Sequence, residues 1–69
     1  MEQETEKILD KLRSKRLEQK ISLLNLANSV EISHSHLFYI ESKRVIPSID
    51  IFVKIANALN VDFNDFFIN

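Results

Sequence analysis

Residues 23–42, LLNLANSVEISHSHLFYIES, decide the fold of this 69-residue chain. Two segments with helical spacing of apolar residues flank a short polar interruption, which predicts two helices joined by a tight turn. Such helices cross at about 90–120°, and Ala27 is the small residue that lets them approach. The apolar positions expected at their contact are Leu26, Val30, Ile32, Leu37 and Ile40. The stretch therefore predicts a helix-turn-helix motif.

The second of these helices leaves a polar and aromatic face turned outward. Its members are His34, Ser35, Phe38, Tyr39 and Ser42. This composition is unlike that of a core, and in helix-turn-helix proteins the second helix lies in the major groove of DNA. The face therefore predicts a surface that reads DNA.

The rest of the chain predicts three more helices, so the expected fold class is all-α. The five expected ranges are 3–19, 23–29, 34–42, 49–59 and 63–67. Four of them follow a residue suited to the N-cap, namely Ser22, Ser33, Ser48 and Asp62. In the fourth range the apolar face is expected to hold Ile49, Phe52, Val53, Ala56 and Leu59. No segment alternates with period two for long enough to indicate a strand.

The chain contains no glycine, although helices often end in a left-handed residue that is usually glycine or asparagine. At the four turns where such a residue is expected, the sequence has Lys20, Glu31, Lys43 and Asn60. We therefore expect a positive φ at these positions, at a cost of about 1 kcal/mol for each lysine or glutamate.

Length and composition exclude several classes of protein. Residues 1–69 are expected to form a single domain, and a homodimer would add buried area to so small a core. With no cysteine and two histidines, we expect no disulfide, no metal site and no cofactor. No apolar run approaches the roughly 20 residues of a membrane span, and the acidic start is unlike a signal peptide. These features favour a cytoplasmic protein with no membrane contact.

Charge is segregated along the chain. Residues 11–44 hold seven basic and three acidic residues, a net charge of +4, while the remaining segments hold two lysines and seven acids, a net charge of −5. A basic motif between acidic ends suits a protein that neutralises DNA phosphates. Ordinary solvated helix faces are the alternative interpretation.

From about Leu9 to Phe67 the chain resembles the lambda-repressor-like, or Cro/C1-type, helix-turn-helix regulators of the XRE family. The resemblance rests on KLRSKR (11–16), LANSVEIS (26–33), LFYIESKR (37–44), VIPS (45–48) and IANALNVDFNDFF (55–67). It implies a compact five-helix lambda-repressor-like DNA-binding domain. It also implies a two-fold dimer whose third helix reads base edges in double-stranded DNA.

The resemblance assigns roles to particular residues. The reading face would comprise Ser33, His34, Ser35, Phe38 and Tyr39. Residues nearer the DNA backbone would be Ser22 and Leu23 at the start of the second helix, then His36, Ser42, Lys43 and Arg44. An arginine in the first helix that pairs with a glutamate late in the third is matched by Arg16 and Glu41. This structural ion pair would fix the reading helix to the scaffold.

Three positions depart from the family pattern. Leu23 replaces a common glutamine that contacts a phosphate, and Glu31 replaces the glycine of the turn. The reading face also lacks Gln, Asn and Arg, which make bidentate contacts with adenine or guanine. These departures bear on the affinity for DNA more than on the fold.

Several residues have a plainer alternative. His34 is either a base contact or a solvated histidine, and Arg16 either half of an internal pair or a surface cation. Phe38 and Tyr39 can pack on thymine methyl groups and sugars, or can form a protein contact. Phe63 and Phe66 are expected in the core. The surplus apolar residues near the end predict a dimer interface of Ile51, Ile55, Phe67 and Ile68.

The leading functional hypothesis is a sequence-specific DNA-binding transcriptional regulator, a repressor that binds a near-palindromic operator as a homodimer. The alternative is a protein-interaction module or antitoxin-type subunit that uses the same fold to bind a partner regulator protein. An enzyme is not expected, because the chain has neither a glycine-rich phosphate loop nor a nucleophile–base set.

Overall fold

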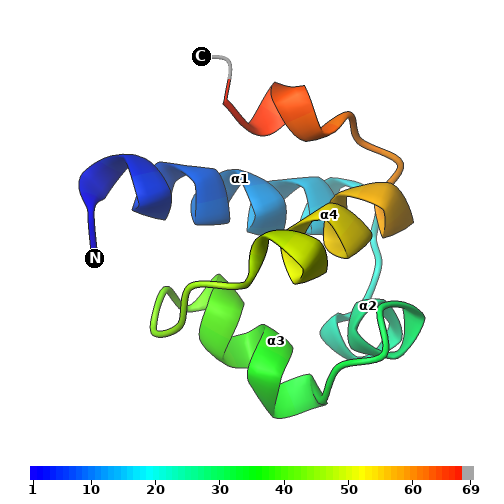
Figure 1. Ribbon diagram of the computed structural model, residues 1–69. Helices are drawn as coiled ribbons and strands as arrows, with labels where there is room; N and C mark the ends of the chain where they lie inside the picture. The colour runs from blue at the N-terminus through cyan, green and yellow to red at the C-terminus, as the bar shows by residue number, and fades with distance from the viewer. Residues whose placement is uncertain (68–69) are drawn as a thin grey trace.

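The computed structural model describes residues 1–67, which form four α-helices and one 3-10 helix (Figure 1). The elements are α1 (Gln3–Glu18), α2 (Leu23–Ser29), α3 (His34–Glu41), α4 (Ile49–Ala58) and η1 (Phe63–Phe66). No strand occurs among these described residues. The all-α prediction is confirmed, with one difference: the last element is a single 3-10 turn, because four residues are too few for an α-helix to gain from its i→i+4 hydrogen bonds.

Helices α2, α3, α4 and η1 each begin directly after the N-cap residue that the sequence predicts. The side chains of Ser22, Ser33 and Ser48 accept hydrogen bonds from backbone N–H groups three residues later, at 3.0, 3.0 and 3.1 Å. Asp62 accepts the N–H of Asn64 at 2.9 Å. Each cap satisfies a donor that a helix terminus otherwise leaves without an intrahelical partner.

The four turns also have the predicted backbone conformation. The φ angles are 58° at Lys20, 60° at Glu31, 64° at Lys43 and 60° at Asn60. After each turn, a backbone N–H returns to a carbonyl of the preceding helix, as from Ile32 to Ala27 at 3.0 Å. This pattern ends a helix with a left-handed residue, so the chain achieves without glycine what glycine usually supplies.

Replacing Lys20 by glycine is expected to leave the free energy of unfolding unchanged or to raise it by up to about 1 kcal/mol. The variant removes the left-handed strain at φ 58°, and its more flexible unfolded chain offsets part of the gain. Lys15→Gly, within α1, is the matched control and should cost about 1 kcal/mol. Urea denaturation compares the two variants. Equal losses would show that the turn at Lys20 carries no strain.

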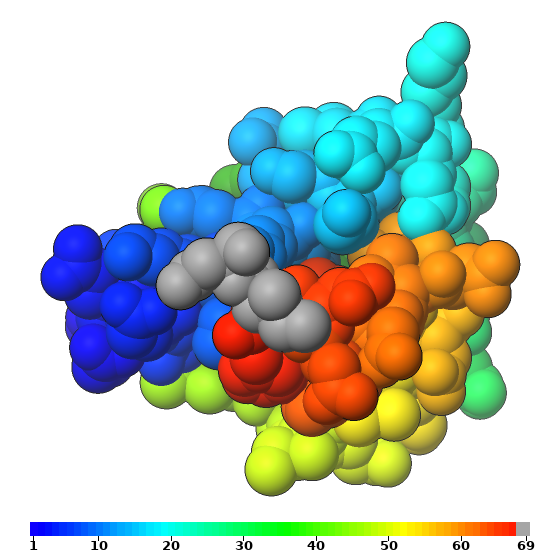
Figure 2. Space-filling view, turned by 90° about the horizontal axis from the view of Figure 1, so that it is seen from above, coloured from blue at the N-terminus to red at the C-terminus, as the bar shows by residue number. Residues whose placement is uncertain are grey.

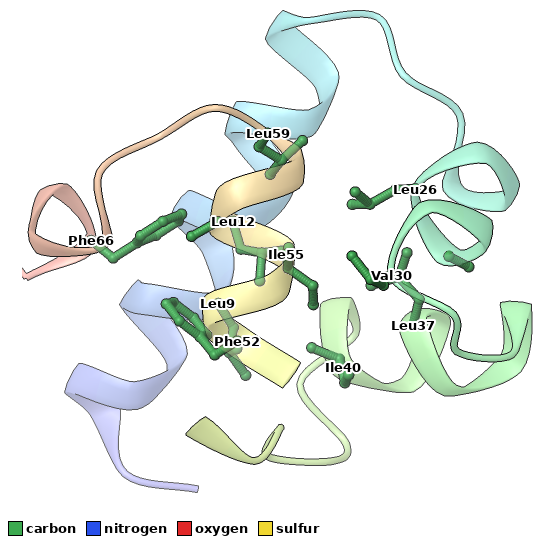
Figure 3. Packing of buried hydrophobic residues seen from close by; sticks show 12 residues of the cluster. Leu9, Leu12, Leu26, Val30, Leu37, Ile40, Phe52, Ile55, Leu59 and Phe66 are labelled. Carbon is green, nitrogen blue, oxygen red and sulfur yellow. The ribbon is translucent and has the colours of Figure 1, made fainter. Parts of the chain in front are cut away.

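The core lies where α1, α2, α3 and α4 meet, and η1 closes it against α1 and α4. Ala27 is fully buried at the crossing of α2 and α3. In Figure 3, Leu37 and Ile40 point from α3 into the interior, where Ile55 lies. The buried face of α4 comprises Phe52, Ile55, Ala56 and Leu59.

The predicted apolar face of α4 is wrong at its first residue. Ile49 is 77% exposed, although it lies only about 20° around the helix from buried Ala56, because it is the first residue of α4 and the buried part of the helix begins one turn later, at Phe52. Ile55 takes the inward position and is 0% exposed. Its predicted place in a dimer interface is therefore also wrong, since a fully buried side chain cannot contact a second copy.

Candidate nucleic-acid interface

Helix α3 lies at one edge of the molecule with its outer side uncovered. In Figure 1 it is at the lower edge, at the opposite end from η1. Leu37, Ile40 and Glu41 are its buried residues. The predicted reading residues, Ser33, His34, Ser35, Phe38 and Tyr39, are all exposed, and so is Ser42, whereas His36 is half-buried. The structure therefore brings the predicted face together on one accessible surface.

A buried ion pair fixes α3 to α1. Arg16 Nε lies 2.8 Å from Glu41 Oε2, and Arg16 Nη2 donates to Glu41 Oε1 at 2.9 Å. The two side chains are 10% and 5% exposed. Arg16 Nη1 also donates to the carbonyl oxygen of Ile21 at 2.8 Å. A planar guanidinium with three directed contacts sets the orientation of α3 relative to α1 and to the start of α2.

The aromatic residues on the outer side contact each other. The rings of Phe38 and Tyr39 meet edge to face with centroids 5.8 Å apart. The guanidinium carbon of Arg44 lies 5.8 Å from the centre of the Tyr39 ring, within cation–π range. Arg44 is exposed, so its charge lies beside the aromatic pair at the surface.

The two cations after α3 have different environments. Lys43 Nζ lies 3.1 Å from Asp10 Oδ1 in α1, which partly compensates its charge. For Arg44 the recorded side-chain contact is with the Tyr39 ring. Lys43 therefore helps to hold the turn after α3 against α1. The charge of Arg44 is more available to an external anion than that of Lys43.

The capping serines keep a donor for an external acceptor. The oxygen of Ser22 accepts the N–H of Asn25, and that of Ser33 accepts the N–H of His36. A hydroxyl that accepts one hydrogen bond still carries its own O–H. Both serines are exposed and can donate to a phosphate oxygen.

A shallow hollow beside α3 includes a residue that the sequence analysis missed. Arg13, Leu23, Phe38 and Ser42 line it together with the buried ion pair. Arg13 lies three residues before Arg16 in α1, a spacing that places both on neighbouring parts of one helix face. This spacing is the feature of the sequence that could have identified Arg13 as a neighbour of α3. Leu23 is half-buried and packs on the core. It therefore makes an apolar contact within the protein at the position where the family's common glutamine contacts a phosphate.

The predicted dimer residues do not form one surface. Phe67 is 55% exposed, whereas Ile51 is half-buried against the core, and Ile55 is buried as described above. Ile68 lies outside the described residues. Ile49, and not Ile51, lines a hollow together with Phe67.

Within residues 1–67, no group of three His, Cys, Asp or Glu side chains is placed to hold a metal ion. Across the same residues, none of the helices has the length and apolar character needed to cross a membrane.

A family model described as "Helix-turn-helix" matches residues 12–66, which begin in α1 and end at the last residue of η1. No curated protein and no solved structure matches the chain.

Proposed function

Because the chain belongs to the Cro/C1-type helix-turn-helix (XRE) family of DNA-binding transcriptional regulators, we propose that it is a sequence-specific repressor that reads its operator with α3. The observation that supports this proposal is the difference in burial between the two sides of α3. Its inner side is buried and held by Arg16, while its outer side is exposed over its whole length. We further propose that residues 1–69 act as a single domain in the cytoplasm.

The reading residues suit base edges in the major groove. His34 presents an imidazole that can donate to a guanine acceptor, and the Ser35 hydroxyl can donate or accept. Phe38 and Tyr39 suit the methyl group of thymine and the sugars. The proposed specificity therefore rests on single hydrogen bonds and apolar contacts, and not on bidentate amide or guanidinium contacts.

The proposed phosphate contacts surround this face. Ser22 and Ser33 donate hydroxyls, Lys43 and Arg44 follow α3, and Arg13 lines the neighbouring hollow of α1. These five residues all lie between positions 11 and 44, the segment with a net charge of +4. Contacts with phosphates position the protein, and contacts with bases select the sequence.

We propose that two copies bind the two half-sites of a near-palindromic operator as a homodimer. Such half-sites lie about 34 Å apart, whereas the principal dimensions of the molecule are 27 × 23 × 21 Å. Two copies can therefore lie side by side along one face of the duplex, with their α3 helices in successive major grooves.

The salt dependence of DNA binding tests this function. We expect affinity to fall steeply as salt rises, and Arg44→Ala to reduce the slope of log K against log [salt] by about 1, as for one lost phosphate contact. Lys54→Ala is the matched control, because Lys54 lies on α4 and is paired with Asp50 at 3.5 Å. Fluorescence anisotropy with a labelled duplex measures both slopes.

The result would contradict the proposal if binding were weak and indifferent to sequence, and if both variants had the slope of the parent. That outcome would favour the alternative function, a subunit that uses this fold to bind a partner regulator or a toxin.

A further inference from the structure

An apolar hollow of about 150 Å³ opens on a part of the surface that the proposed DNA contact does not use. It lies between the N-terminal half of α1, the first turn of α4 with the loop before it, and η1 with the residue that follows it. Figure 2 shows these three segments meeting on one face, in blue, yellow-green and red. No residue of α3 lines the hollow.

Large apolar side chains stand exposed around this hollow. Ile46 is 62% exposed, Ile49 77% and Phe67 55%. The less exposed rings of Phe52 and Phe63 contact each other and the Phe67 ring, with centroids 4.9–6.4 Å apart. A rigid aromatic base with projecting aliphatic side chains is typical of a protein-binding surface, whereas single scattered apolar residues are ordinary.

The charges near the hollow indicate what kind of partner fits it. The chain segments that line it lie outside residues 11–44, in the part of the sequence with a net charge of −5. Acids sit in each of the three elements: Glu4 and Glu6 in α1, Asp50 in α4, and Asp65 in η1. Two of these acids are paired with lysines, Glu4 with Lys7 and Asp50 with Lys54, both at 3.5 Å, so the surplus negative charge among these residues comes from Glu6 and Asp65.

We propose that this hollow binds an amphipathic segment of a different protein, with apolar side chains that enter between Ile46, Ile49 and Phe67 and with Lys or Arg on its flanks. Complementary charge favours this occupant, since it brings cations to chain segments whose net charge is negative. A second copy of the chain would bring the same negatively charged segments against themselves. The proposal does not depend on DNA binding, because the hollow and the outer side of α3 share no residue.

The test uses two synthetic probe peptides in titrations of the full chain followed by amide NMR shifts. One is an amphipathic helix of about 18 residues with leucines on one face and lysines on its flanks; the other has glutamates in place of the lysines. We expect the lysine peptide to shift the amides of Ile46, Ile49 and Phe63, and to bind at least about tenfold more tightly than the glutamate peptide.

Two variants locate the binding. Ile49→Ser should weaken the lysine peptide at least about tenfold, and Leu24→Ser, which removes an exposed leucine from α2, should not. Operator binding should be unchanged in Ile49→Ser. Failure of the DNA experiments alone would leave this proposal intact.

Four results would overturn the proposal. The first is equal affinity for the two peptides, and the second is equal loss in the two serine variants. The third is a concentration-dependent doubling of mass in sedimentation that Ile49→Ser removes, because a second copy would then cover the hollow. Absence of any shift at millimolar lysine peptide would have the same consequence.

Discussion

Replacing Arg16 by methionine is expected to lower the free energy of unfolding by about 3–5 kcal/mol. The substitution removes three hydrogen bonds, two to Glu41 and one to the carbonyl oxygen of Ile21. It also leaves the Glu41 carboxylate, 5% exposed, without its cation. The free-energy cost of leaving one buried charge unpaired is larger than the net stabilisation that the intact pair provides. The single variant should therefore be strongly destabilised.

The double variant Arg16→Met with Glu41→Leu separates these two contributions. Because it removes both charges, it should recover most of the loss seen in the single variant. Lys15→Met is the surface control, since Lys15 pairs only with exposed Glu18 at 3.9 Å, and should change stability by less than about 0.5 kcal/mol. Chemical denaturation followed by circular dichroism measures all three. An unchanged midpoint in Arg16→Met would rule out the structural role of the pair.

Replacing Ser35 by glutamate is expected to reduce operator affinity by at least about 100-fold, or roughly 3 kcal/mol. The new carboxylate would stand at the exposed start of α3, within the face proposed to approach bases and phosphates. An acid in the first turn of a helix interacts favourably with the helix dipole, so the fold should be retained. The loss would therefore report on the interface itself.

Asn57→Glu is the matched control for the added charge. Asn57 is exposed on α4, outside the proposed reading face, and the variant should bind the operator within about threefold of the parent, the effect of a solvent-screened charge that makes no contact with DNA. Gel-shift titration at fixed salt measures both variants. Similar affinities for Ser35→Glu and Asn57→Glu would contradict the assignment of α3 as the reading helix.

Local features of this fold could be predicted from the sequence because neighbouring residues determine them. The serine caps depend on a side chain and an N–H group three residues away, and the left-handed turns follow from the geometry of a helix end. For this reason Lys20 and Lys43 were placed correctly although neither is a residue that favours positive φ.

Features that depend on packing between distant segments could not be predicted in the same way. Helical spacing groups residues on a face but does not fix how far along or around the helix another element covers that face, so Ile49 and Ile55 were assigned the wrong environments. The apolar hollow joins three separate segments of the chain, and nothing in any one of them indicates it. Arg13 was missed because its position beside α3 depends on how α1 packs on that helix.

The most direct measurement is an NMR search for contacts between protein side chains and bases, using a duplex selected from a random pool for tight binding. We expect intermolecular NOEs from the rings of His34, Phe38 or Tyr39 to base protons in the major groove, including thymine methyl groups. NOEs from α4 or η1 alone, with the outer side of α3 unperturbed by the duplex, would contradict this expectation.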